Sequence, residues 1–208
     1  MSSPIFFNNV PTITLYDPLA EVLGAASDGI FHYTYTDVVK LAGHSCPTVA
    51  GAYLMVCKGL GLLYGEAFPL RGEIRVTIKG NLGDGVVGVI ANVASMITGA
   101  TEKSGFHGLG GRFDRRNLLF FDSDMTADMA LERLDSGEKV MLTYDPGIIP
   151  SDARMAAWLK MTLSGEADSQ VREWFRSAWQ ERVKNILIDF REDFRLIQYR
   201  FENNGVNK

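Results

Sequence analysis

Several short segments alternate apolar and polar side chains, which is the period of a half-buried strand. In residues 29–35, for example, the three aromatic side chains fall on one face and His32 falls on the other. The run Val86–Ile90 is rich in valine and isoleucine and indicates a fully buried strand. The pattern as a whole predicts five or six strands, at residues 11–16, 29–35, 73–79, 86–90, 118–122 and 139–144.

Other segments place apolar residues three and four positions apart and carry the start and stop signals of helices. Asp17 is expected to cap a short helix at residues 18–26, because Pro18 suits the first helical position. Thr36 is expected to cap a second helix that ends before Gly43. Pro47 can begin a third, largely buried helix that runs to about residue 64.

The last part of the chain changes to helix-forming residues. Ser151 is expected to cap one helix, and a Ser-Gly pair at residues 164–165 separates it from a longer one. That longer segment carries an apolar stripe at helical spacing over about 27 residues, from Val171 to Ile197. Such a stripe needs a large partner surface, either the core of the same chain or a second subunit.

Together these elements predict an α+β fold: a mixed or antiparallel sheet with packed helices and a long C-terminal helical extension. We expect an α+β core at residues 1–147 and a helical extension at residues 148–208. The extension is expected to pack on the core or on a dimer partner. A chain of 208 residues, 46% of them hydrophobic, can fill such a core.

Composition and charge argue against several classes of protein. The net charge of −4 and the dispersed basic residues give no basis for binding nucleic acid. The longest apolar stretch, residues 49–63, contains Lys58 and is shorter than a membrane span, so it predicts a buried helix. The amino terminus lacks the pattern of a signal peptide. Two cysteines cannot form a disulfide scaffold, and we expect a cytoplasmic protein with both thiols reduced.

The joint between two predicted helices, residues 42–47, holds the most reactive residue types of the chain. Cys46 is expected at or beside the start of a helix, where backbone N–H groups and the helix dipole favour a thiolate. His44 adds a second donor, and imidazole with thiolate suits zinc or a related divalent metal. A structural alternative remains open, in which His44 bonds a carbonyl group and Cys46 only caps the helix.

Further metal ligands would have to come from the other histidines of the chain, His32 and then His107. Cys57 lies about 16 Å from Cys46 along a continuous helix and is expected to be an inert core thiol. The glycine-rich segment ending at Arg112, with Arg115 behind it, is open to two interpretations: an anion-binding loop or a turn with solvated charges. The motifs of zinc deaminases, papain-like proteases and nucleotide-binding loops are absent.

At these residues the chain resembles the FmdE family, which takes its name from a component of formylmethanofuran dehydrogenase. The resemblance covers about residues 11–122. It rests on Gly-His-Ser-Cys-Pro at residues 43–47, the small-residue helix after it, and the Ile-Thr-Gly-Ala-Thr segment at residues 97–101. The resemblance implies an α+β core in an intertwined homodimer, with a metal or redox role for the histidine and the cysteine. It does not imply formylmethanofuran dehydrogenase activity.

The chain departs from the family pattern at two places. Many members carry a further cysteine and an aspartate where this chain reads Val89-Ile-Ala-Asn92, and Gly-Cys-Thr where it has Gly-Ala-Thr at residues 99–101. A C-terminal zinc finger found in some members is also missing, since no cysteine follows Cys57. His32 or His107 would then have to replace the missing ligands.

Two functions therefore remain open. In the first, Cys46 and His44 bind a zinc-like ion, or act as nucleophile and base, in a metal-dependent or redox enzyme for a small molecule. A loop at residues 105–111 would roof the pocket. In the second, the chain is a noncatalytic accessory or sensor subunit that acts through dimerisation and partner docking.

Overall fold

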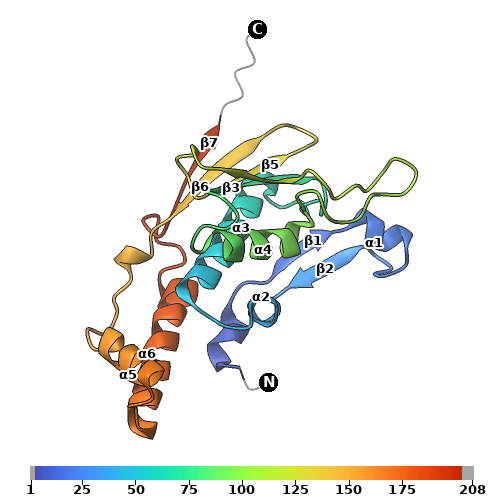
Figure 1. Ribbon diagram of the computed structural model, residues 1–208. Helices are drawn as coiled ribbons and strands as arrows, with labels where there is room; N and C mark the ends of the chain where they lie inside the picture. The colour runs from blue at the N-terminus through green and yellow to red at the C-terminus, as the bar shows by residue number, and fades with distance from the viewer. Residues whose placement is uncertain (1–2, 203–208) are drawn as a thin grey trace.

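The computed structural model describes residues 3–202 and confirms the predicted α+β class (Figure 1). The strands are β1 (Ile13–Tyr16), β2 (Ile30–Tyr33), β3 (Ile74–Lys79), β4 (Leu119–Asp122), β5 (Met129–Arg133), β6 (Lys139–Tyr144) and β7 (Ile197–Glu202). The helices are α1 (Pro18–Val22), α2 (Tyr35–Ala42), α3 (Pro47–Tyr64), α4 (Val87–Thr98), α5 (Met155–Ser164) and α6 (Ser169–Lys184). Shorter turns are the 3-10 turns η1 (Ile5–Asn9) and η2 (Pro146–Ile148) and the π-helical turn η3 (Asn185–Asp189).

The main sheet has five strands in the order β4-β3-β5-β6-β7. Only β3 and β4 run parallel, joined by a crossover that contains α4, and the remaining neighbours are antiparallel. Strands β1 and β2 form a separate antiparallel hairpin. The sheet is therefore mixed, as the sequence predicted.

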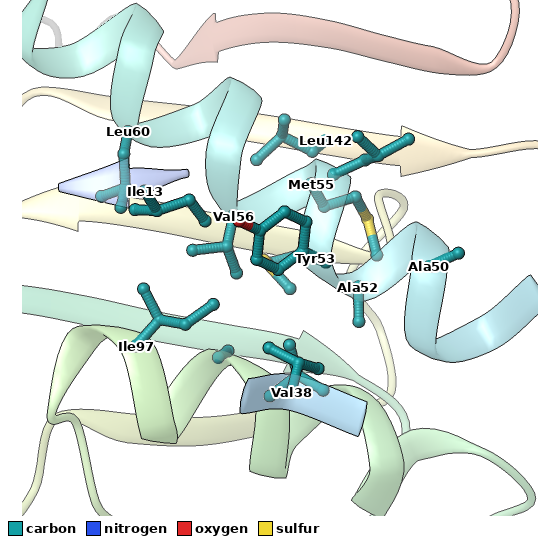
Figure 2. Close-up of a cluster of buried hydrophobic side chains, with 14 of the residues drawn as sticks. Ile13, Val38, Ala50, Ala52, Tyr53, Met55, Val56, Leu60, Ile97 and Leu142 are labelled. Carbon is teal, nitrogen blue, oxygen red and sulfur yellow. The ribbon is translucent and has the colours of Figure 1, made fainter. Parts of the chain in front are cut away.

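Helix α3 is the centre of the core. It packs on β5 and β6 on one side and on α2 and α4 on the other, so the helices form a layer between the sheet and the β1–β2 hairpin (Figure 1). Figure 2 shows the contacts: Met55 lies near Leu142 of the sheet, whereas Ile97 of α4 and Val38 of α2 lie below the helix. Because α3 is buried on most sides, its apolar residues do not keep to a narrow stripe.

The ends of α2 and α3 follow from local sequence. Thr34 and Asp37 form a capping box at the start of α2, two residues before the Thr36 cap that the sequence suggested. Gly43 ends α2 in the left-handed conformation, with φ of 73°, and its N–H group donates to the carbonyl oxygen of Val39. Pro47 begins α3 as predicted.

Two predictions about strands were wrong. Val86–Ile90 forms the start of α4, because a short run of apolar β-branched residues cannot be told from a buried helix by its period. The helix continues to Gly99, a left-handed cap, and packs on α3 and β3. Strand β5 was missed, since burial of Met129, Ala130 and Leu131 removes the alternation of apolar and polar residues.

The C-terminal part is helical only as far as Asp189. The apolar stripe from Val171 to Ile197 is not one helix. Its first part lies on α6 and η3, which end at Asp189, and the chain then turns and forms β7, which pairs with β6. The predicted helical extension therefore contributes an edge strand to the main sheet. A pair of helices, α5 and α6, extends away from the sheet (Figure 1). Residues 203–208 of the predicted extension lie outside the described residues.

Helix α3 is long and apolar enough to cross a membrane by composition alone, but 67% of it is buried within the fold. That burial is typical of a core helix. The other long apolar helix, α4, is shorter than a membrane span.

Candidate functional site

The joint between α2 and α3 consists of Gly43, His44, Ser45 and Cys46, which we call the corner. Cys46 is the N-cap residue of α3, as the sequence predicted, and its Sγ accepts a hydrogen bond from the N–H group of Val49 at 3.5 Å. The side chain is half-buried and packs against the core. The thiol thus lies at the positive end of the α3 dipole.

The orientation of His44 follows from one hydrogen bond. Its Nδ1 lies 2.9 Å from the carbonyl oxygen of Ala42, which can only accept, so Nδ1 carries the proton. The lone pair of Nε2 is therefore free, and the ring is exposed. A histidine held in this way at one nitrogen by a carbonyl group is arranged as in metal sites, where the outer hydrogen bond fixes the tautomer.

A cavity of about 120 Å³ lies beside His44. Its wall comes from α2, the corner and the first half of α4, and its lining residues are Leu41, Ala42, His44, Val89, Asn92 and Val93. Among these, only His44 and Asn92 have polar side chains. The cavity can therefore hold a small, largely apolar molecule that donates a hydrogen bond to Nε2 of His44 or bonds the amide of Asn92.

Contacts from distant parts of the chain hold the corner in place. The hydroxyl groups of Tyr35 and Ser45 are 2.9 Å apart, and the Tyr144 hydroxyl donates to the carbonyl oxygen of Pro47 at 2.8 Å. Trp179 of α6 donates its indole N–H to the carbonyl oxygen of Ser45 at 2.9 Å. The sequence did not reveal these partners, and they make the corner a rigid part of the core.

The other predicted metal ligands lie elsewhere. His32 is exposed on β2, where its Nδ1 is 2.9 Å from the Thr14 hydroxyl of β1. His107 is exposed in the long loop between α4 and β4. Within residues 3–202, no three His, Cys, Asp or Glu side chains form a group that could hold a metal ion. Of the predicted ligands, only His44 and Cys46 lie in the corner, and of these two only His44 lines the cavity.

The loop at residues 105–111 does not roof the cavity beside His44. It is anchored by Arg115, whose backbone N–H group donates to the carbonyl oxygen of Phe106 and whose guanidinium packs against Gly99 at the C-terminal end of α4. That end lies about 10 Å along the helix from Asn92, which lines the cavity. The expected lid is thus attached to the opposite end of α4.

Arg115 takes part in a buried charge cluster that sequence reasoning missed. Its guanidinium donates to one oxygen of Asp17 at 2.7 Å, and Arg71 donates to the other at 2.9 Å. Asp17 and Arg115 are 3% and 5% exposed. The same Asp17 side chain caps α1, and Arg71 also binds the last carbonyl groups of α4. The charge of Arg115 is thus paired inside the protein. For this residue the structure favours neither the anion-binding loop nor the turn with solvated charges.

Cys57 lies in the middle of α3 and is half-buried rather than fully buried as predicted. Burial raises the pKa of its thiol, an effect that the nearby Arg191 and Lys58 only partly oppose. Cys57 is therefore protonated at neutral pH and a poor nucleophile.

We expect the two thiols to react at different rates. At pH 7 a thiol reagent should modify Cys46 several-fold faster than Cys57, because Cys46 lies at a helix N-terminus. Stopped-flow titration of the native protein checks this, and Cys46→Ser should remove the fast phase while Cys57→Ser removes the slow one. Equal rates for both thiols would contradict the distinction.

Comparison with models of protein families gives no match for this chain, and comparison with curated proteins gives none.

Proposed function

We propose that this chain is a metal-binding protein similar to the FmdE family, in which His44 and Cys46 supply two ligands to a divalent ion, with zinc as the first candidate. The observation that carries the proposal is the Nδ1 hydrogen bond of His44 to Ala42, which leaves Nε2 free two residues from a helix-capping thiol. Neutral imidazole and thiolate are ligands that zinc prefers.

The protein's residues prepare these two donors. The Ala42 carbonyl holds the His44 ring, and the N–H group of Val49 with the α3 dipole offsets the charge of a Cys46 thiolate. With His44 and Cys46 as its protein ligands, such an ion would leave positions open for water or a small molecule. When bound, such an ion would supply Lewis acidity to a ligand in the adjacent cavity.

The wall of that cavity supports the relation to the family. Many family members carry a cysteine and an aspartate in the segment that here reads Val89-Ile-Ala-Asn92, and Val89 and Asn92 both line the cavity with His44. In this chain Val89 is apolar and Asn92 is uncharged. We propose that the cavity takes a small molecule in a metal-dependent or redox reaction, with Cys46 and His44 as the reactive pair and the amide of Asn92 orienting the ligand.

A second candidate is a noncatalytic accessory or sensor subunit. The observation that favours it is the contact of Trp179 and Gln180 with the Ser45 carbonyl group, which connects α6 to the corner. In a sensor, zinc binding would change hydrogen exchange in α5 and α6, whereas an enzyme needs no such change. In both cases we propose a cytoplasmic homodimer.

We expect protein purified without a metal-affinity tag, then supplemented with zinc, to hold about one zinc ion per chain. His44→Ala and Cys46→Ser should each weaken zinc binding by at least about tenfold, because each removes one of two protein ligands. Elemental analysis and calorimetric titration measure both quantities.

His32→Ala, His107→Ala and Cys57→Ser are the matched controls, since these side chains lie away from the corner. They should leave zinc binding unchanged, and all five variants should keep the wild-type melting curve. Wild-type protein that stays free of metal after supplementation, with Cys46 no more reactive than Cys57, would show that the corner is only structural.

A further inference from the structure

Strand β7 forms one edge of the main sheet, at its outer margin in Figure 1. It pairs with β6 along its whole length, from Tyr144↔Ile197 to Lys139↔Glu202. Within residues 3–202, no strand pairs with its other side. Five of its six residues are exposed. An edge of this length is a template for another strand unless something blocks it.

The direction of the free backbone groups follows from the β6–β7 ladder. The N–H group of Leu196 donates to the carbonyl oxygen of Asp193 in the preceding turn, but its own carbonyl oxygen accepts from the N–H group of Asp145 and so points toward β6. Because antiparallel ladders alternate, Gln198, Arg200 and Glu202 direct their backbone groups toward β6. The N–H and C=O groups of Ile197, Tyr199 and Phe201 therefore point outward from the sheet.

The same three residues carry the apolar side chains of the strand. Tyr199 and Phe201 are paired in register with Leu142 and Val140, buried residues on the face covered by α3. Their rings pack edge to face, yet they remain 49% and 43% exposed. The opposite face of β7 is polar. The edge thus combines unpaired backbone groups with two aromatic rings left half in solvent.

We propose that this edge binds the β7 strand of a second copy of the chain, antiparallel, with Tyr199 facing Tyr199 across a two-fold axis. Ile197 of each copy then faces Phe201 of the other, so every outward-directed residue meets an apolar or aromatic partner. Three hydrogen-bonded pairs give about six hydrogen bonds between the copies. The two five-stranded sheets become one continuous sheet.

The side chains select this register over its neighbours. On the apolar face, Ile197 meets Phe201 and the two Tyr199 rings meet each other, both favourable cross-strand pairs. On the polar face, Gln198 meets Arg200. A shift that centres the pair on Arg200 would place like charges opposite each other, and a shift to Phe201 would shorten the ladder within residues 197–202.

The first test is the mass of the protein in solution. Wild type should be a dimer by light scattering over a dilution series, and Tyr199→Pro should raise the dimer dissociation constant by at least about tenfold. Proline removes the N–H group that points outward and leaves the bonds to β6 in place. The control Tyr199→Phe keeps the backbone and the ring and should stay dimeric.

A second test measures the register in which the two β7 strands pair. In this arrangement the two Cα atoms of residue 199 lie about 5.5 Å apart, within reach of a disulfide. Those of residue 201 lie about 14 Å apart. Mild oxidation should therefore cross-link Tyr199→Cys and spare Phe201→Cys and wild type.

Several results would overturn the proposal. These are a monomeric wild type, a Tyr199→Pro variant that folds and dimerises as wild type does, or a cross-link at residue 201 in preference to 199. If Tyr199→Pro fails to fold, the oxidation experiment decides alone. The interface is independent of zinc binding at the corner, so its failure leaves the metal site standing, whereas a monomeric wild type would also contradict the homodimer proposed together with that site.

Discussion

A chain shortened to end at residue 163 is expected to aggregate or to lose its cooperative melting transition. The deletion removes β7, which leaves the edge of β6 unpaired. It also removes Val183, Ile186, Leu187 and Leu196, all of which are 0% exposed in the main core. Light scattering and thermal melting of the purified fragment measure the effect. A fragment that stays soluble, with the oligomeric state and melting temperature of the full chain, would refute this account.

A single substitution isolates the packing contribution. Ile186→Ala should lower the free energy of unfolding by roughly 2–5 kcal/mol, the usual range for removing a large aliphatic side chain from a core. Leu163→Ala is the matched control, because Leu163 is 78% exposed. It should change the free energy of unfolding by less than about 0.5 kcal/mol. Denaturant titration compares the two variants.

Replacing Asp17 with asparagine should destabilise the fold by roughly 3–5 kcal/mol. Arg71 and Arg115 would remain as buried or partly buried cations without a counterion, and that is the costly way to break a buried ion pair. Asparagine keeps the shape of the side chain and can still cap α1. The matched control is Asp114→Asn, which affects an exposed pair with Arg116 and should have little effect.

The same cluster predicts a dependence on pH. Burial alone would raise the pKa of Asp17, but the hydrogen bond from Arg71 and the charge of Arg115 together hold that pKa below its ordinary value. A carboxyl group whose pKa is lowered on folding stabilises the fold above the unfolded pKa, about 3.9. That stabilisation is lost as the pH falls below about 4. Denaturation of wild type at a series of pH values should show this loss, and Asp17→Asn should show less of it.

Much of the fold could be predicted because its signals are local. Gly43 and Pro47 mark the joint between α2 and α3, and the alternation of residues 73–79 marks β3. Where burial covers both faces, the local signal fails: α4 reads as a strand over Val86–Ile90. Residues 197–202 do alternate apolar and polar side chains, but the apolar stripe was interpreted as one helix as far as Ile197, so the return of the chain as β7 was missed.

The residues of the site could likewise be predicted only where their signals are local. Cys46 could be placed at a helix start because the sequence itself holds the helix signals. The ion pair of Arg115 with Asp17 joins residues 98 positions apart, and no spacing rule connects them. Likewise, the cavity wall at Asn92 depends on how α4 packs beside α2, which is a tertiary contact. His32 and His107 were chosen for their residue type alone, and the fold separates them.

The hydrogen bond between Trp179 and the Ser45 carbonyl group connects the fluorescence of a natural side chain to the corner. Of the three tryptophans, Trp158 and Trp174 pack against each other between α5 and α6, and only Trp179 is bonded to the corner. Its indole N–H binds the residue that lies between His44 and Cys46. Events that move that peptide are therefore expected to change the emission of Trp179, and a variant that lacks Trp158 and Trp174 would report occupancy of the corner by this emission alone.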